Sequence, residues 1–516
     1  RMHIAEFVGY RVRTVERAMP GFSATDLLVP SSNGGEVYRF DAAGRHLQTL
    51  HALTGAALLT FGYDPGGRLE SITDGDSKIT TIQRGGAGNP NSMTAPFGQK
   101  TTLVTGVNGN LQTISNPSNE SLQIHTTASG LITQMSNPRG KVSSYGYGAQ
   151  GRLTSASDNG GFSQTLAQSG TRLDYSVTRT TGLGRSAVYQ VSRSFDRTQE
   201  NTNTAPDGSQ SAVQFQVALG SMTASSATGM SSTISERPDP RFGMQSRIVG
   251  SAEVSASSGP TLVASSSSEA ELSIPDDPLS LVSLTDTVVI DGRETTSSYS
   301  TAGKTVIQTS AEGRVTTQVI DNLGRVVSTQ FGDLAPLTAS YNVVGQLESL
   351  TSGMGDDARF TQFTYGADGF RDSVTDPLGH TVTYLYDDAG RITTKTLPGN
   401  IDIVFDYDAA GDLGSITPPG QPEHAFTYTL HGQIETITPP LVSGSGPTTF
   451  EYNDDKQLLV IKQPGNESIS FAYDLQGRLQ SIDLAQGGFP SATYTLAYGV
   501  SNRLETVTGP GSQTVA

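Results

Sequence analysis

The sequence contains no cysteine and no tryptophan among its 516 residues, and only 16% of its residues are charged. Without cysteine the chain can form neither disulfides nor thiolate metal sites. The sequence therefore does not indicate whether the chain resides in a reducing or an oxidising compartment. It has no apolar run of the roughly 18 residues that a membrane-spanning helix needs, and we expect a chain that is not membrane-spanning. The formal net charge of −16 disfavours contact with a phosphate backbone, so we expect no nucleic-acid partner.

Glycine is plentiful, at 58 of the 516 positions, where average usage is about 7%. A chain of this length would ordinarily hold three or four domains at about 150 residues each, but a repeat array can grow without that limit.

The sequence starts Arg1-Met2-His3-Ile4 without a charged and apolar leader. We therefore expect a fragment of a longer protein, with no signal peptide visible in it.

A short motif, Tyr-Asp-x-x-Gly-Arg-Leu, recurs through the sequence. Fifteen copies can be aligned on the first residue, the anchor, and twelve of these anchors are Tyr or Phe. Most successive anchors lie 21 residues apart, and a few lie 23 to 25 apart. Such a fixed period predicts a repeat architecture in which each unit packs on its neighbours. The anchors lie at positions 40, 63, 105, 126, 147, 299, 320, 341, 365, 386, 407, 428, 452, 473 and 498.

The residues after the anchor predict a tight hairpin turn. The fourth is Gly in thirteen of the fifteen copies and Asn502 in another, which indicates a backbone position with positive φ. Lys456 is the exception, and we expect it to be strained or to mark a remodelled loop. Asp or Asn directly after the anchor can accept hydrogen bonds from backbone N–H groups across the turn. The anchor and turn residues that we single out as structural are Tyr63, Gly67, Tyr147, Gly151, Tyr386, Gly390, Tyr407, Gly411, Tyr428, Gly432, Tyr473 and Gly477.

The residues around the turn predict two strands. A large apolar residue usually stands two before the anchor, as Phe405 does before Tyr407, and this spacing places both on one face of a strand. Leu, Ile or Val follows six after the anchor, and another apolar residue often comes three later, which suggests a bulge or a corner. Pro-Gly turns then reverse the chain again. We expect the aromatic pairs Phe405/Tyr407, Phe426/Tyr428 and Phe471/Tyr473 to stack on their equivalents one repeat away.

The repeats divide the chain unevenly. Residues 1–39 read as a β segment without the signature, residues 40–160 and 291–516 hold regular repeats, and residues 161–290 hold irregular, Ser/Thr-rich β repeats. We interpret these as one continuous all-β structure. At 21 residues each, 516 residues make about 24 units and 45 to 50 strands, and strands spaced about 4.8 Å apart would form a ribbon more than ~200 Å long. Such a ribbon must curl or close. Periodicity leaves open whether its inside is packed or hollow.

The Tyr-Asp-x-x-Gly-Arg-Leu unit resembles the YD-repeat family, which includes bacterial RHS (rearrangement hot-spot) proteins, the C component of insecticidal toxin complexes and animal teneurins. The segment 238–245 (Pro-Asp-Pro-Arg-Phe-Gly-Met-Gln) is also similar to a stretch recurring in bacterial members. The resemblance implies a β-ribbon spiralling into a hollow shell, and a bacterial protein that is secreted or on the cell surface. In toxin members the shell holds a C-terminal toxin, released by Asp residues of a terminal core segment. That segment is not seen in this sequence, so no release chemistry is assigned to any residue.

The sequence offers no catalytic, cofactor-binding or metal-binding constellation. Nucleophile-elbow, phosphate-loop, dinucleotide and zinc-protease motifs are missing from it. The run 74–77 (Asp-Gly-Asp-Ser) lacks the glutamate that completes a calcium loop, so we read it as a turn. His424 and His431 read as scattered strand or surface histidines.

Two functions remain. The leading hypothesis is a non-enzymatic shell section that encloses or displays a toxin or other C-terminal segment outside this sequence, with that polypeptide as its partner. The alternative is a cell-surface adhesin that binds carbohydrate or a protein partner through its outer face.

Overall fold

The computed structural model describes residues 2–6, 11–15 and 26–515, except 217–219, 258, 441–445, 488–489 and 500–502. A two-stranded hairpin, β1 (Met2–Glu6) and β2 (Arg11–Val15), stands apart from the main sheet. From β3 (Asp26–Pro30) to β46 (Thr514–Val515), each strand pairs antiparallel with the next one in the sequence. The chain is therefore one long meander, as the all-β prediction required. Among the described residues, helix is limited to two 3-10 segments, η1 (Gly355–Asp357) and η2 (Pro510–Ser512), and no helix is long and apolar enough to span a bilayer.

The first stretch of the sheet contains short strands of five to seven residues with strong alternation. Its strands are β4 (Glu36–Asp41), β5 (His46–His51), β6 (Ala57–Tyr63), β7 (Leu69–Asp74), β8 (Ile79–Arg84), β9 (Pro90–Thr94), β10 (Lys100–Thr105), β11 (Leu111–Ser115), β12 (Ser121–Thr126), β13 (Ile132–Ser136), β14 (Val142–Tyr147) and β15 (Leu153–Asp158).

The Ser/Thr-rich stretch that follows is also strand, and it includes the longest strands of the sheet, β23 and β24. Alternating Thr, Ser and Val side chains suit extended backbone, so a polar composition here does not produce a linker. Its strands are β16 (Ser163–Gly170), β17 (Tyr175–Thr181), β18 (Ser186–Arg193), β19 (Thr198–Thr204), β20 (Gln210–Gln216), β21 (Ser221–Ser225), β22 (Ser231–Asp239), β23 (Gly243–Ser255), β24 (Thr261–Leu272) and β25 (Leu281–Ile290).

The last stretch returns to short, regular strands. These are β26 (Arg293–Ser300), β27 (Thr305–Thr309), β28 (Val315–Ile320), β29 (Val326–Phe331), β30 (Leu337–Tyr341), β31 (Leu347–Ser352), β32 (Arg359–Tyr365), β33 (Arg371–Thr375), β34 (Thr381–Tyr386), β35 (Ile392–Leu397), β36 (Ile401–Tyr407), β37 (Leu413–Thr417), β38 (His424–Tyr428), β39 (Ile434–Thr438), β40 (Thr448–Tyr452), β41 (Leu458–Gln463), β42 (Glu467–Tyr473), β43 (Leu479–Ala485), β44 (Ala492–Tyr498) and β45 (Leu504–Thr508).

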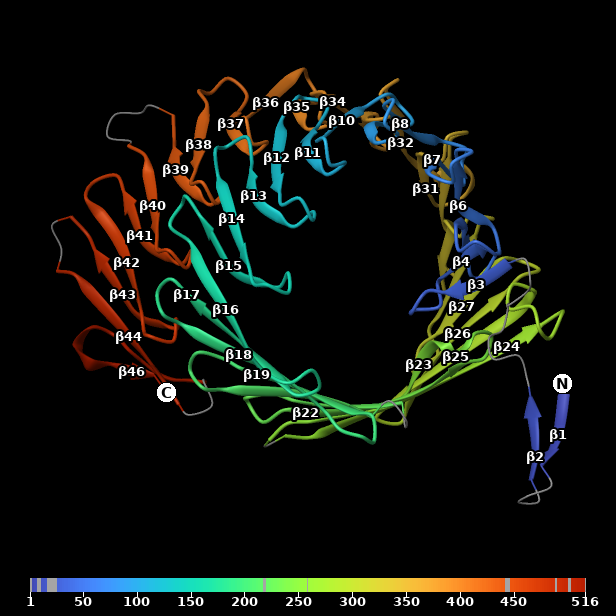
Figure 1. Cartoon of the computed structure of the whole chain (residues 1–516). Helices are drawn as coiled ribbons and strands as arrows, with labels where there is room; N and C mark the ends of the chain where they lie inside the picture. Colours follow the sequence, from blue (N-terminus) through green and yellow to red (C-terminus); the bar gives the residue numbers. More distant parts are fainter. Residues whose placement is uncertain are drawn as a thin grey trace.

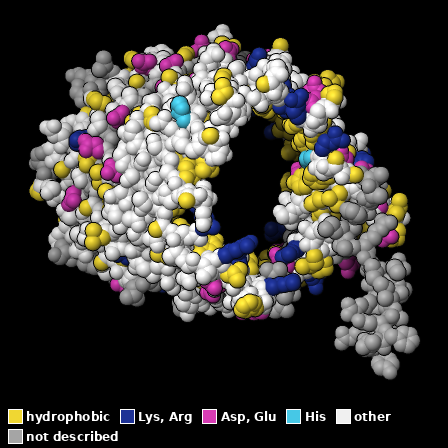
Figure 2. All heavy atoms as spheres, in the orientation of Figure 1, with side chains coloured by type: hydrophobic (Ala, Val, Ile, Leu, Met, Phe, Trp, Pro, Cys, Tyr) yellow, Lys and Arg dark blue, Asp and Glu magenta, His cyan; other side chains and the backbone are white. Residues whose placement is uncertain are grey.

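The sheet coils through more than one turn around an open centre. In Figure 1 the later strands β31 and β32 lie beside β7 and β8, and β35 and β36 lie beside β10 to β12. Figure 2 shows that side chains do not fill the middle of the ring, because an opening passes through it, with hydrophobic side chains along much of its wall. The prediction of a curled sheet is confirmed. The repeat period alone did not tell whether the interior is packed or hollow, and Figure 2 shows that it is hollow.

Few side chains are fully buried, as expected for a coil that is one sheet thick. Most of the buried hydrophobic residues form two clusters, one between β4, β5 and the β22–β23 turn and one among β25, β26 and β28. The first contains Val37, Leu50, Ala52 and Phe242, and the second contains Leu281, Leu284, Tyr299 and Ile320.

Candidate functional site: the tyrosine ladder, the seam and the clasp

The loop after most anchors is a five-residue turn closed at both ends, whereas the loop after Tyr299 has a different hydrogen-bond pattern. In the copy after Tyr63, the N–H of Asp64 donates to the carbonyl of Arg68 at 2.9 Å, and the N–H of Gly67 donates to the carbonyl of Asp64 at 2.8 Å. The carboxylate of Asp64 accepts the N–H of Arg68 at 2.9 Å and its Nε at 2.8 Å. These bonds lower the pKa of the Asp64 carboxyl group. Asp, Gly and Arg therefore recur together because each satisfies a part of one turn.

The turn glycines occupy the left-handed region with one exception, Gly303, whose φ is not positive and whose neighbour Lys304 has φ of 48° instead. Gly390, Gly411, Gly432 and Gly477 have φ of 82°, 87°, 77° and 89°. Lys456 has φ of 65° within the same hydrogen-bonded loop, so this loop keeps its form and the non-glycine residue adopts the disfavoured conformation. The corresponding prediction for Asn502 lies outside the described residues.

Gly390→Ala should destabilise the protein more than Gly67→Ala. Both glycines have positive φ, which costs an L-residue about 1–2 kcal/mol. A Cβ at residue 390 would also lie 2.7 Å from Cζ of the Phe370 ring, whereas one at residue 67 would meet nothing within 4 Å. Urea unfolding of both variants measures the difference. Equal losses of free energy would show that the Phe370 ring moves aside at no cost.

A bulge follows most of these turns, where the offset of three residues predicted one, but the strands joined by the turn after Tyr299 pair without a register shift. Tyr63 pairs with Leu69, but Phe61 pairs with Ile72, so the register shifts by one residue between the two pairs. The same shift occurs at Tyr407, where Leu413 and Ile416 are the partners. The extra residue lets both apolar residues of the return strand face the aromatic residues of the outgoing strand.

The anchor tyrosines tie successive repeats together through their hydroxyl groups. The hydroxyl of Tyr407 donates at 2.9 Å to the carbonyl of Ile392, which is the sixth residue after the preceding anchor. The same bond recurs through the array and forms what we call the tyrosine ladder. Its donor–acceptor pairs are Tyr63–His46, Tyr147–Ile132, Tyr341–Val326, Tyr365–Leu347, Tyr386–Arg371, Tyr407–Ile392, Tyr428–Leu413, Tyr452–Ile434, Tyr473–Leu458 and Tyr498–Leu479.

The expectation that anchors stack ring on ring with those one repeat away is wrong. Equivalent anchors lie two strands apart, roughly 9.6 Å at about 4.8 Å per strand, beyond the ring separations of stacked pairs. Within the described residues, the aromatic ring contacts involve neither Phe405, Phe426 and Phe471 nor their anchors. The arginine of the preceding turn fills the space instead, as Arg391 does 4.8 Å from the centre of the Tyr407 ring.

Tyr407→Phe should cost about 1 kcal/mol, the usual net value of one intramolecular hydrogen bond. Partial burial raises the pKa of the Tyr407 hydroxyl above its ordinary 10.0. Because the pKa of this hydroxyl is higher in the folded than in the unfolded protein, the neutral hydroxyl contributes its full stability at pH values below the ordinary pKa. That contribution to the free energy of unfolding is lost as the pH rises through the raised pKa. Urea unfolding at neutral and alkaline pH should show the difference between Tyr407→Phe and wild type shrinking at alkaline pH. Tyr189, which is 41% exposed, provides the control, and Tyr189→Phe should have no effect at either pH.

A row of contacts, which we call the seam, joins the second turn of the coil to the first. The loops that follow the anchors of β28 to β42 contact first-turn loops that follow return strands, such as loop 74–78 after β7. Contacting partners in the β34 to β42 part lie 269 to 274 positions apart, and 271/21 gives about 13 repeats per turn of the coil. The first-turn loops are 74–78, 95–99, 116–120, 137–141, 158–162, 181–185 and 205–209.

Opposite charges meet along the seam. Arg391 Nη1 lies 2.7 Å from Glu120 Oε1, and it keeps the bond to Asp387 within its own turn. Arg185 Nη1 lies 2.7 Å from Asp455 Oδ2, with the two side chains only 11% and 9% exposed. From Glu120 to Asp207, the first-turn member of successive pairs is alternately acidic and basic. The remaining pairs are Arg325–Asp76, Arg139–Asp408, Arg139–Asp412 and Arg478–Asp207.

One histidine belongs to the seam. His431 Nδ1 lies 3.4 Å from Asp158 Oδ2, and these side chains are 9% and 3% exposed. The reading of His431 as a scattered strand or surface histidine is wrong, because it is buried between the two turns of the coil. Sequence reasoning missed this and the seam pairs because their partners lie some thirteen repeats away and share no motif.

A second fastening, which we call the clasp, is formed by the turn between β22 and β23. Phe242 is 2% exposed and inserts into the cluster with Val37, while Arg241 donates from Nη1 to the carbonyl of Ala52 at 2.8 Å. Asp239 Oδ1 accepts the N–H groups of Arg241 and Phe242 at 2.7 and 3.0 Å. Burial lowers the pKa of the Arg241 guanidinium, although Asp239 opposes the shift. The clasp thus holds the first strands of the coil against its middle.

The turns, the tyrosine ladder, the seam and the clasp all join strands or turns of the coil to one another. Nowhere in the described ranges do three His, Asp or Glu side chains gather as metal ligands would. The carboxylates of the turns and the seam are bound to arginine or to backbone N–H groups, as Asp64 and Asp455 are. The fold and these contacts define a repeat protein in which one antiparallel sheet coils around an opening.

The chain belongs to the Teneurin YD-shell family, and the match to this family covers residues 24–509. Among curated proteins it is similar to teneurin-4 of Mus musculus, at 29% identity, and to teneurin-1 of Homo sapiens, at 28%. Both matches cover 99 residues, which is 19% of this chain and 4% of those proteins. The YD-repeat resemblance read from the motif is confirmed.

Among solved structures, several that align with the chain come from toxin complexes. The Photorhabdus luminescens Tc holotoxin pore aligns with 95% of this chain and 30% of its own, with 12% identity and a TM-score of 0.39. TcdB2-TccC3 without its hypervariable C-terminal region aligns with 92% of this chain and 30% of its own, with 12% identity and a TM-score of 0.38.

Proposed function

We propose that the chain is a section of the wall of a secreted or cell-surface shell, and that this shell encloses a polypeptide segment of the same longer protein lying outside this sequence. The observation that carries the proposal is the seam. Loops from the two turns pair by charge and hydrogen bonding at successive repeats, so the coil forms a continuous wall around the opening of Figure 2. In this proposal the chain has no catalytic activity of its own.

Protease protection of an attached segment tests the proposal. An unstructured polypeptide with a single protease site is fused after residue 516, and the same polypeptide is fused before residue 1 as the matched control. Enclosure predicts slow cleavage of the C-terminal fusion and rapid cleavage of the N-terminal one. Disrupting the seam with Arg185→Ala should restore rapid cleavage. Equal cleavage of both fusions in the intact coil would contradict enclosure of a C-terminal segment.

A further inference from the structure

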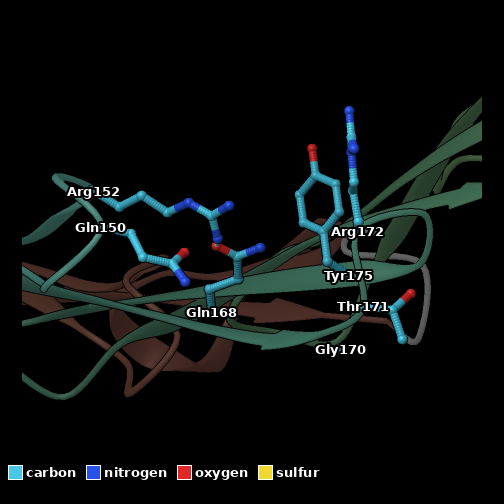
Figure 3. A pocket seen from close by; sticks show the side chains of 7 residues that line it. All are labelled: Gln150, Arg152, Gln168, Gly170, Thr171, Arg172 and Tyr175. Atoms are coloured by element: carbon cyan, nitrogen blue, oxygen red, sulfur yellow. Dashed lines mark hydrogen bonds between the residues drawn. The ribbon is translucent and has the colours of Figure 1, made fainter.

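A groove of about 600 Å³ lies between the β14–β15 loop, β16 and the start of β17, away from the residues of the seam pairs and the clasp. Figure 3 shows Arg152, Gln150 and Gln168 gathered on one side of it, while Tyr175 and Arg172 stand side by side on the other. The guanidinium of Arg152 donates to Oε1 of Gln168, which fixes the two side chains relative to each other.

The tip of the β16–β17 hairpin, at one end of the groove, is tightly closed. Gly170 has φ of 96°, and a Cβ there would run into the backbone carbonyl of Asp174. The N–H of Asp174 donates to Oγ1 of Thr171 at 3.1 Å, and the N–H of Thr171 donates back to the carbonyl of Asp174 at 2.6 Å. Arg172 is exposed to solvent at this tip.

The groove carries positive charge that the protein does not neutralise. Neither Arg152 nor Arg172 forms an ion pair with a described residue, unlike the arginines of the seam. Asp174, the carboxylate nearest to Arg172 in sequence, instead accepts bonds from Ser192 Oγ at 2.7 Å and from the N–H of Arg193 at 3.2 Å. Residues 150–200 contain six arginines and four acidic residues, a net charge of +2 in a chain of net charge −16.

We propose that this groove binds an acidic oligosaccharide, with sugar carboxylates on Arg152 and Arg172 and one ring against Tyr175. Guanidinium groups bind carboxylates through paired hydrogen bonds, and the glutamine amides can serve sugar hydroxyl groups. The volume lies within the range of about 300–1,000 Å³ of small-ligand sites. Of the groove's lining residues, only Tyr175 offers a large apolar surface, which disfavours an apolar ligand.

Two other ligand classes fit the groove less well. An extended peptide would need a free strand edge, but β16 is paired with β15 on one side and with β17 on the other. A nucleic acid would need many more cationic contacts than two arginines provide, on a protein of opposite net charge. The site is independent of what the shell encloses, so it can succeed or fail separately from the proposed function.

Calorimetric titration with three carboxylate-bearing oligosaccharides, namely tetragalacturonate, an alginate tetramer and a hyaluronan tetramer, tests the proposal. At least one should bind, and its methyl ester should bind at least about tenfold more weakly because the charge-assisted bonds are lost. Arg172→Gln and Arg152→Gln should each weaken binding about tenfold, and Arg172→Lys should weaken it less. Arg314→Gln, which alters an exposed arginine elsewhere in the coil, is the matched control and should leave the affinity unchanged.

Each of the following results would overturn the proposal. None of the three acids binds to the intact coil, or the methyl ester binds as tightly as the acid. The Arg152→Gln/Arg172→Gln double variant keeps wild-type affinity, or a glutamate-rich peptide of equal charge binds through the same arginines equally well. Both arginines are exposed, so unchanged circular dichroism is expected for these variants and separates lost binding from lost folding.

Discussion

Phe242→Ala should destabilise the coil by about 3–5 kcal/mol, the usual cost of truncating a fully buried phenylalanine. Phe242 is 2% exposed and fills a cluster with Val37, Leu50 and Ala52, one of two such clusters in the described chain. A single-layer sheet has few other buried side chains to compensate for the cavity. Urea unfolding measures the loss, and hydrogen exchange should locate it first in β3 to β5.

Phe195 provides the matched control because its side chain is fully exposed. Phe195→Ala should change the free energy of unfolding by no more than about 0.5 kcal/mol, as surface substitutions usually do. A loss below about 1 kcal/mol for Phe242→Ala would show that the clasp does not hold the first strands in place.

Arg185→Ala should cost about 3–5 kcal/mol, because it leaves the carboxylate of Asp455 buried between the turns without its cation. Thr181 Oγ1 also bonds to that carboxylate, at 3.1 Å, but it brings no charge. Adding Asp455→Ala to Arg185→Ala should recover part of the loss, because the unpaired charge is then removed. Urea unfolding of both single variants and the double variant completes the cycle.

The pair Arg293–Glu312 is the control for burial, with side chains 65% and 51% exposed. Arg293→Ala should cost about 0–1 kcal/mol, the range of exposed ion pairs. If Arg185→Ala costs no more than Arg293→Ala, the seam contributes nothing to the stability of the coil.

Local chemistry made the repeat readable from the sequence. The left-handed turn, the same-face aromatic pair and the bulge after Leu69 or Leu413 each depend on residues fewer than fifteen positions apart. Patterns of that range appear in the sequence as spacing. The Ser/Thr-rich stretch could be assigned to strands for the same reason, since alternation persists there.

The contacts between turns of the coil could not be read in this way. Arg185 and Asp455 are 270 positions apart, and nothing in either local motif distinguishes a seam arginine from a solvent-facing one. The sequence did single out the clasp, because the segment 238–245, which includes Asp239 and Phe242, departs from the repeat. The strands that it contacts at the start of the coil have no such distinguishing feature in the sequence. The error about ring stacking came from treating sequence neighbours as spatial neighbours, although an intervening strand separates equivalent anchors.

A disulfide between the two turns tests the central claim most directly, and the absence of native cysteine makes its result unambiguous. In the coil, a Cβ on Gly345 would meet the carboxyl group of Asp76, which places residues 76 and 345 within disulfide reach. The variant Asp76→Cys/Gly345→Cys should therefore cross-link on oxidation. The control Asp76→Cys/Gly67→Cys should not, since residues 67 and 76 lie at opposite ends of β7. Peptide mapping that finds no bond between residues 76 and 345 in the folded protein would contradict the coil, as would a bond between residues 67 and 76.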